Sequence, residues 1–169
     1  ELQNIGYDVM YHYSVGDNPG RLKELIAFAF HDCDLILTTG GLGPTQDDLT
    51  KEVIAEAMGD VIVENEECMK ALLKRYEKNG RPMTPNNLKQ ANMPSRAKVL
   101  PNDAGTAPGF ALEKDGKLII SMPGPPREMK RMFELQVKPI LESMQDSVIY
   151  YKILRTFGLG ESSMETVLL

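Results

Sequence analysis

The sequence predicts an α/β fold with a mainly parallel sheet, and three observations support this. Leu35, Ile36 and Leu37 form a short continuous apolar run, which is typical of a strand covered on both faces. Amphipathic helical patterns lie before and after this run. A segment of strand-like composition precedes the first helix, so the order is strand, helix, strand, helix. That order is characteristic of parallel sheets, which bind ligands at the carboxyl ends of their strands.

Composition limits the class of protein. A chain of 169 residues with 42% hydrophobic and 25% charged residues fits one α/β domain with a small appendage. A net charge of −5 argues against a nucleic-acid partner. No apolar run approaches the roughly 18 residues of a membrane span. Cys33 and Cys68 form neither a CxxC pair nor a metal cluster, so we expect inert thiols in a cytoplasmic protein.

The first predicted elements lie before residue 32. Residues 7–15 are rich in β-branched and aromatic side chains and predict a strand. Asn18 is placed to cap a helix whose first position is Pro19. Apolar residues at helical spacing extend this helix to about His31: Leu22, Leu25, Ile26 and Ala29.

The next elements follow from spacing and turn residues. Residues 61–63 predict a short strand or an extended connection. Helical spacing from Met69 to Tyr76 predicts a helix that ends at Gly80. Residues 80–109 are rich in Pro, Asn and Gly and predict mostly loop.

The last third predicts a small β-hairpin and a helix. Residues 110–124 alternate around Asp115-Gly116, a favoured two-residue hairpin turn. Residues 125–144 have apolar side chains near helical spacing, with Pro139 expected to kink or split the helix.

We divide the chain into an α/β domain at residues 1–145 and the start of a C-terminal α+β extension at residues 146–169, which the sequence leaves truncated. Within the extension, residues 147–158 predict a strand and residues 161–169 the start of a helix. The sequence does not begin with Met, and we expect residues to precede Glu1.

The stretch TTGGLGPTQDD, residues 38–48, lies between a predicted strand and a predicted helix. Gly40, Gly41 and Gly43 would let a ligand approach main-chain amides closely, and a strand-to-helix junction favours phosphate or another anion. The dinucleotide and P-loop signatures do not fit. The alternative is structural, with Thr45 capping the helix and Asp48 completing a capping box.

Asp47 and Asp48 are adjacent carboxylates beside this loop. They would repel a phosphate unless a divalent cation lay between, and Mg²⁺ binds one or two carboxylates together with phosphate oxygens. We therefore predict a metal-assisted phosphate or pyrophosphate site. Asp48 is the leading metal ligand and Asp47 the second, and both are candidate catalytic residues.

Six segments, in order, resemble one family. TTGGLGPTQDDLTKE resembles the signature of the molybdopterin-binding-like domain of CinA, the competence/damage-inducible proteins. SVGDN, TPNNLKQA, GTAPGF, MPGPPREM and FGLGES agree with the same family. The resemblance covers nearly the whole chain. Family members also begin with a strand carrying Gly-Thr-Glu-Leu-Leu and a following Asn-Thr-Asn segment, and neither occurs in this sequence.

The resemblance implies a three-layer α/β sandwich of the molybdopterin-binding type. It also implies metal-dependent hydrolysis of ADP-ribose, or a similar dinucleotide, to AMP and a sugar phosphate. The expected cation is Mg²⁺ or Co²⁺, with K⁺ as a further candidate. In related molybdopterin adenylyltransferases, threonine stands at the position of Leu42 and arginine at that of Asp47, while Asp48 matches their functional aspartate. These differences favour the CinA-type activity.

Three further loops supply candidate ligand-binding residues, each with turn formation as its alternative. GTAPG would close over the nucleotide, MPGPP would form a second anion site, and the two adjacent asparagines would hydrogen-bond a base or ribose. The predicted phosphate- or nucleotide-binding residues are Thr39, Gly40, Gly41, Gly43, Thr45, Asn86, Asn87, Gly105, Gly109, Pro123, Gly124 and Pro125.

Two other functions remain open: adenylyl transfer to a pterin, and ligand binding without turnover inside a larger protein. We expect a small nucleotide as substrate and neither nucleic acid nor membrane as partner. Because related domains commonly self-associate, we also expect a homo-oligomer.

Overall fold

The structure, a computed structural model, describes residues 1–80, 82–145, 155, 157–158 and 160–168. Its helices are α1 (Pro19–Asp32), α2 (Thr50–Ala57), α3 (Glu66–Asn79), α4 (Pro126–Met132), α5 (Lys138–Ser143) and α6 (Glu161–Leu168), with short turns η1 (Gln3–Ile5), η2 (Pro85–Ala91) and η3 (Phe133–Val137). Its strands are β1 (Leu35–Thr39), β2 (Ile62–Glu64), β3 (Asn92–Pro94), β4 (Lys98–Leu100), β5 (Gly109–Lys114) and β6 (Lys117–Met122). No helix of the described residues is both long and apolar enough to cross a membrane.

The larger sheet has the order β1-β6-β5-β4. β1 and β6 are parallel, with Leu37 opposite Ile120, whereas β6, β5 and β4 pair antiparallel. The α/β class is confirmed, and the sheet is mixed because its predicted hairpin contributes two of its four strands. β2 and β3 form a separate two-stranded antiparallel ribbon.

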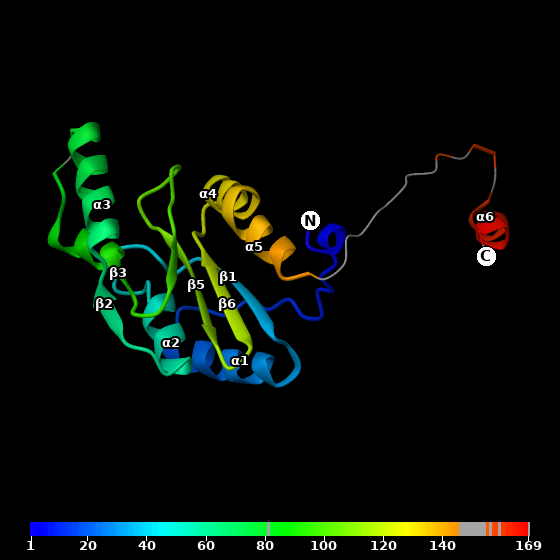
Figure 1. The fold of residues 1–169 in the computed structure, drawn as a ribbon, viewed down its shortest axis with the longest axis horizontal. Coiled ribbons are helices and arrows are strands. Elements are labelled where there is room, and N and C mark those ends of the chain that lie inside the picture. Colours follow the sequence, from blue (N-terminus) through cyan, green and yellow to red (C-terminus); the bar gives the residue numbers. More distant parts are fainter. Residues whose placement is uncertain (81, 146–154, 156, 159, 169) are drawn as a thin grey trace.

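Helices cover both faces of the sheet, which gives the three expected layers (Figure 1). Because side chains alternate along a strand, β6 contributes to two cores. Ile119 packs in the core that includes Ile26 of α1 and Ile54 of α2. Ile120 packs in the other core, with Leu141 of α5. All five side chains are almost fully buried.

Local sequence signals set several of these bounds. Asn18 accepts a hydrogen bond from the Arg21 main chain and Pro19 occupies the first turn of α1, as predicted. Gly80 ends α3 in the left-handed conformation, also as predicted. The hairpin turns at Asp115-Gly116, where both φ angles are positive (51° and 76°), as a two-residue turn of this kind requires.

The C-terminal helical layer is interrupted as expected from Pro139. A π-helical turn, η3, separates α4 from α5, and Pro139 lies at the start of α5. A proline has no N–H to donate, and the wider turn before it avoids the lost bond and the ring clash of a regular helix. α6 agrees with the helix predicted at residues 161–169. The strand predicted at residues 147–158 falls almost entirely outside the described residues.

The strand predicted at residues 7–15 is not a strand in the structure. This segment is extended but pairs with no described strand, and five of its large hydrophobic side chains are exposed: Val9, Met10, Tyr11, Tyr13 and Val15. Side-chain hydrogen bonds connect this segment to α5 and α1. The Tyr7 hydroxyl donates to the Leu141 carbonyl (2.9 Å), and the Tyr11 hydroxyl donates to the Asp32 carboxylate (3.2 Å). Composition indicates an extended conformation, but pairing requires an adjacent strand edge, which composition does not specify.

Candidate functional site

Two glycine-containing loops meet at the carboxyl ends of the parallel strands β1 and β6. The loop after β1, residues 39–48, is called the glycine loop below. The Thr39 hydroxyl donates to the Pro123 carbonyl (2.8 Å), and the Gly40 N–H donates to the Met122 carbonyl (3.0 Å). A Cβ on Gly124 would lie 3.4 Å from the Gly40 Cα. Residues 39–41 and 123–125, predicted as separate anion sites, are therefore neighbours.

Contacts inside the glycine loop account for two of its glycines. A Cβ on Gly41, whose φ is +69°, would lie 2.0 Å from the Thr50 Oγ1. A Cβ on Gly43 would lie 2.6 Å from the Asp48 Oδ2. Both distances are below contact distance, so an alanine at either position would displace the Thr50 or the Asp48 side chain from its hydrogen bonds.

Asp48 folds back onto the glycine loop. Its Oδ2 accepts hydrogen bonds from the Thr45 N–H (2.9 Å) and the Thr45 hydroxyl (2.6 Å), and the Gly43 main chain donates to the same carboxylate. Burial alone raises the pKa of Asp48, but these donors and the Lys89 charge outweigh it and hold the pKa below its usual value. The loop thus binds one anion already, which is its own Asp48.

The structural alternative for Thr45, capping of the following helix, is wrong. α2 begins at Thr50 with Leu49 as its N-cap, and the cap makes no side-chain hydrogen bond. Thr45 and Asp48 make the side-chain-to-main-chain contact of a capping box, but within a separate turn before the helix. The Thr-x-x-Asp spacing does form the expected turn, but in the loop and not at the helix start, because the same turn occurs in loops.

Lys89, which is not among the predicted site residues, connects η2 to the glycine loop. Its ammonium group donates to the carbonyls of Thr45 (3.1 Å) and Asp48 (2.5 Å) and lies 3.5 Å from a Glu52 carboxylate oxygen. The side chain is only 22% exposed. It places a positive charge beside a loop that carries two aspartates. Its only sequence signal is its position within the TPNNLKQA segment.

Lys51 lies under the same region and is almost fully buried. Its ammonium group donates to the Lys89 carbonyl (2.7 Å). Burial lowers the pKa of Lys51 to about 8, and the neighbouring Glu52 only partly offsets this effect. Glu52 Oε2 is itself buried and has no hydrogen-bond partner among the residues that the structure describes. Lys51 and Glu52 therefore place charges of both signs beneath the glycine loop, and their hydrogen bonds and ion pairs only partly offset the cost of burying them.

The GTAPG loop packs against the first turn of α4. The Asn102 side chain accepts a hydrogen bond from the Gly105 N–H (2.8 Å) and donates one to Glu128 (2.7 Å). A Cβ on Gly105 would lie 1.9 Å from Glu128 Oε2, and one on Gly109 would lie 2.5 Å from the Ser121 carbonyl. Close packing thus accounts for both glycines, and Glu128 is hydrogen-bonded within the protein.

The two predicted asparagines differ in position. Asn87 accepts hydrogen bonds from the Thr84 N–H and hydroxyl, so it closes a capping box at the start of η2. Asn86 is exposed and lines a small cavity of about 390 Å³ together with Pro44, Thr45 and Lys89. Asn87 therefore has the alternative role given for these residues, which is turn formation. Asn86 keeps a free face beside the glycine loop.

The carboxylates near the glycine loop supply only part of the ligands that a divalent cation needs. Among the described residues, no three His, Cys, Asp or Glu side chains gather closely enough to hold a metal ion. Asp47 is exposed and Asp48 is held by the loop, so protein groups alone do not make a cation site. Mg²⁺ commonly takes one or two carboxylates and completes its shell with phosphate oxygens and water. Asp47, with Asp48, would hold such a cation only together with a phosphate ligand.

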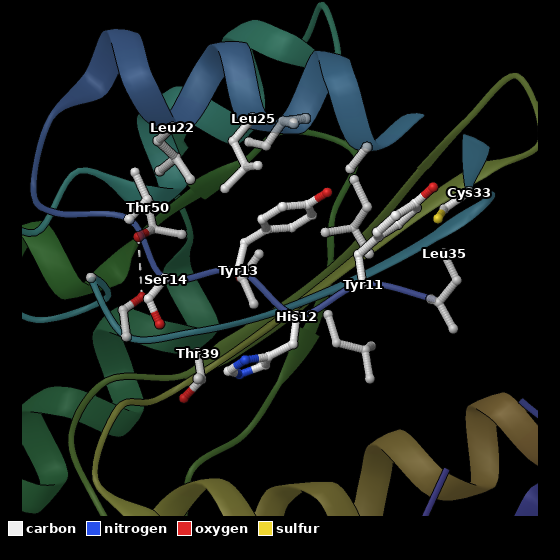
Figure 2. A pocket seen from close by; sticks show the side chains of 18 of the residues that line it. Tyr11, His12, Tyr13, Ser14, Leu22, Leu25, Cys33, Leu35, Thr39 and Thr50 are labelled. Carbon is white, nitrogen blue, oxygen red and sulfur yellow. Dashed lines mark hydrogen bonds between the residues drawn. The ribbon is translucent and has the colours of Figure 1, made fainter. Parts of the chain in front are cut away.

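A larger cavity of about 810 Å³ borders the glycine loop at Gly40, Gly41 and Asp47. It lies between residues 7–18, α1 and β1. Figure 2 shows Leu22 and Leu25 of α1 above it, and Tyr11, His12 and Tyr13 of the extended segment around it. Its lining is largely apolar, in contrast to the polar glycine loop.

The family model described as "Probable molybdopterin binding domain" matches residues 1–143. The chain belongs to this family. A CinA-like protein of Dictyoglomus turgidum is 48% identical over 164 residues, which is 97% of this chain and 40% of the relative. The chain therefore spans about 40% of the length of the curated relatives it matches.

Solved structures agree with this assignment. The crystal structure of CinA from Thermoplasma acidophilum, described as of unknown function, has a TM-score of 0.75 and 33% identity over 82% of each chain. This confirms the resemblance to CinA. A molybdopterin biosynthesis protein from Mycobacterium abscessus has a TM-score of 0.53 and 17% identity, and covers 85% of this chain and 76% of its own, so it supports the fold alone.

Proposed function

We propose that the chain binds the phosphate groups of a nucleotide or pterin where the glycine loop meets residues 123–125. The contact between these two loops, at the carboxyl ends of adjacent parallel strands, carries the proposal. Gly124 is exposed there. The glycine loop already donates main-chain and hydroxyl hydrogens to a carboxylate, which indicates that its surroundings favour an anion. The family match supports a molybdopterin-type ligand.

Calorimetric titration with inorganic pyrophosphate, AMP and ADP-ribose tests this binding. Gly124→Ala would narrow the gap to Gly40, where the added Cβ would lie 3.4 Å from its Cα. We expect it to weaken pyrophosphate binding at least tenfold. Gly160→Ala is the matched control, because no atom of the described residues lies within 4 Å of the Cβ it would add. A folded protein that binds none of the three ligands would contradict the proposal.

A second, finer candidate is metal-dependent hydrolysis of ADP-ribose to AMP and a sugar phosphate. The exposed Asp47 carboxylate, at the junction of the glycine loop and the larger cavity, favours it. A divalent cation, when bound, would neutralise phosphate charge and lower the pKa of its water. Asp47 would orient that cation, while Asp48 would keep the loop in shape and offer a carboxylate oxygen.

AMP release should be measured with Mg²⁺, with Co²⁺ and with a chelator. We expect Asp47→Asn and Asp48→Asn each to lower metal-dependent release by roughly 100-fold. Full turnover in Asp48→Asn would mean that Asp48 is not a metal ligand. ATP-dependent adenylylation of molybdopterin without AMP release from ADP-ribose would select a transferase. Binding without any turnover would leave the chain as a ligand-binding module of a larger protein.

A further inference from the structure

A small cavity of about 390 Å³ lies between the glycine loop and η2. Its lining comes from these two short segments: Pro44, Thr45, Gln46, Pro85, Asn86 and Lys89. It shares no lining residue with the cavity of about 810 Å³, to which the same loop contributes Gly40, Gly41 and Asp47. The glycine loop and η2 thus enclose a separate space for a ligand, which begins one residue after Gly43.

Hydrogen bonds hold the two walls of the small cavity at a set distance. The Lys89 ammonium group donates to the carbonyls of Thr45 (3.1 Å) and Asp48 (2.5 Å). At the start of η2, the Asn87 side chain accepts hydrogen bonds from the Thr84 N–H (2.9 Å) and hydroxyl (2.8 Å). The cavity is therefore formed before any ligand binds, as is usual for small-molecule sites.

Two side-chain carboxamides of the small cavity are available to a ligand. Gln46 and Asn86 are exposed, and neither is hydrogen-bonded to a residue that the structure describes. The other polar side chains of the lining are already used, because the Thr45 hydroxyl donates to Asp48 and the Lys89 ammonium group donates to two carbonyls. The polar groups that the described lining leaves for a ligand are therefore neutral.

Neutral carboxamides beside proline rings suit a flat heterocycle that carries both a donor and an acceptor. A carboxamide has N–H donors and a carbonyl acceptor side by side. Asn and Gln pair in this way with N6 and N7 of adenine, whereas Arg or Lys is the usual partner of O6 and N7 of guanine. Within the described residues, the only cation that lines the small cavity is Lys89, which is already paired. The cavity therefore favours adenine over guanine and over a further phosphate group.

We infer that the small cavity is the subsite for the adenine base of a nucleotide whose phosphate groups lie on the glycine loop, an inference that rests on the proposed phosphate site. Gln46 and Asn86 hydrogen-bond the polar edge of the base, and Pro44 and Pro85 contact its ring. Because Pro44 directly follows Gly43, the positions of phosphate and base adjoin, as they do within one nucleotide. A volume of about 390 Å³ is near the lower end of the roughly 300–1,000 Å³ of ligand cavities, which suits one ring system rather than a whole dinucleotide.

Calorimetric titration of the chain with AMP, ribose 5-phosphate, GMP and pyrophosphate tests this inference. AMP and ribose 5-phosphate differ only in the base, and we expect AMP to bind at least tenfold more tightly. GMP should bind at least fivefold more weakly than AMP. Equal affinities for AMP and ribose 5-phosphate, with pyrophosphate bound, would overturn the base subsite and leave the phosphate site standing. Equal affinities for AMP and GMP would overturn the assignment to adenine, and binding of none of the four would overturn both proposals.

The two carboxamides allow a test by substitution. We expect the double variant Gln46→Ala, Asn86→Ala to lower AMP affinity at least tenfold, toward that of ribose 5-phosphate, and to leave pyrophosphate affinity unchanged. Asn79→Ala is the matched control, because Asn79 is an exposed residue at the end of α3 that lines neither cavity. Unchanged AMP affinity in the double variant would overturn the inference. An equal loss of AMP and pyrophosphate affinity would also overturn it, because the substitutions would then act on the glycine loop.

The side-chain NH₂ signals of Gln46 and Asn86 give a local readout in the unsubstituted chain. In ¹⁵N NMR spectra, we expect both signals to shift when AMP is added and to stay in place when pyrophosphate is added. The Asn79 signal, from a side chain outside the cavity, should move with neither ligand. Signals of Gln46 and Asn86 that stay in place at saturating AMP would overturn the inference.

Discussion

At the scale of single residues, the side chain of Thr50 determines what the glycine loop tolerates. Its hydroxyl donates to the Gly40 carbonyl (3.1 Å) and its N–H to the Gly41 carbonyl (3.2 Å). These contacts bring the Thr50 Oγ1 to within 2.0 Å of the position that a Gly41 Cβ would take. The packing between β1 and α2 therefore favours glycine at position 41, whether or not a ligand binds.

Gly41→Ala should lower the free energy of unfolding by about 2–4 kcal/mol, because it combines a positive φ with a clash against Thr50. Gly116→Ala is the matched control: its φ is also positive, at +76°, but nothing lies within 4 Å of its added Cβ. The control should lose only about 1–2 kcal/mol. Urea unfolding of the two variants measures the difference, and equal losses would mean that Thr50 moves aside freely.

Asp48 shows how far residue-level reasoning from the sequence could go. Its position predicted a carboxylate at the strand-to-helix junction beside the glycine loop, and the structure shows it hydrogen-bonded to Thr45 of that loop. The sequence could not show that the carboxylate itself accepts the hydrogen bonds of Gly43 and Thr45. That outcome depends on loop dihedral angles, which no spacing rule specifies. The roles of Asp47 and Asp48 in metal binding therefore stay predictions.

At the scale of elements, η2 connects the candidate loops. Lys89 donates to the glycine loop, and the neighbouring Gln90 donates to the Thr106 hydroxyl (3.1 Å) in the GTAPG loop. Lys89 and Gln90 thus link η2 to two loops that are far apart in sequence. A shift of η2 would displace both loops together.

Lys89→Met should release the glycine loop while keeping the apolar stem of the side chain. We expect exchange of the Asp48 amide to accelerate and pyrophosphate affinity to fall about tenfold, which corresponds to about 1.4 kcal/mol. Lys70→Met is the control, because within the described part of the chain Lys70 makes only an exposed pair with Glu66 on α3. Weaker binding without faster exchange would mean that Lys89 acts through its charge alone.

Elements with local signals were predicted well, and elements that depend on distant partners were not. Asn18, Gly80 and the Asp115-Gly116 turn each specify a boundary through their own backbone preferences. The extended segment at residues 7–15 has strand composition, but its pairing depends on an edge elsewhere in the fold. The approach of Lys89 to the glycine loop spans 44 residues, and its only sequence signal is the position of Lys89 within the TPNNLKQA segment.

At the scale of the molecule, the two cores differ in what they enclose. The core between the sheet and α4–α5 consists of hydrophobic residues. The opposite layer includes Lys51, which is almost fully buried and close to the glycine loop, and Cys68, where burial raises the pKa of the thiol. Hydropathy patterns predicted both layers. They could not predict that a lysine would be enclosed in one of them, because lysine is rarely buried so completely.

The buried Lys51 makes global stability depend on pH in a defined window. The pKa of its ammonium group is about 8 in the folded chain, against an ordinary value of 10.5 once unfolding exposes the side chain to water. Between these values the unfolded chain binds more protons, so the free energy of unfolding rises with pH, by on the order of 3 kcal/mol in total. Below pH 8 both the folded and the unfolded chain carry the charge, so Lys51 adds no pH dependence to the free energy of unfolding there.

Lys51→Met should remove that rise, because methionine keeps the buried stem and does not titrate. Urea unfolding at pH 7.5, 8.5 and 9.5 measures it as a difference in slope between the wild type and the variant. Because Lys51 also lowers the pKa of the buried Cys68 thiol, both proteins carry Cys68→Ala, so that the thiol does not contribute to the difference. Lys70→Met, at an exposed position, should keep the wild-type slope. Parallel curves for the wild type and Lys51→Met would show that Lys51 reaches solvent in the folded chain and retains an ordinary pKa.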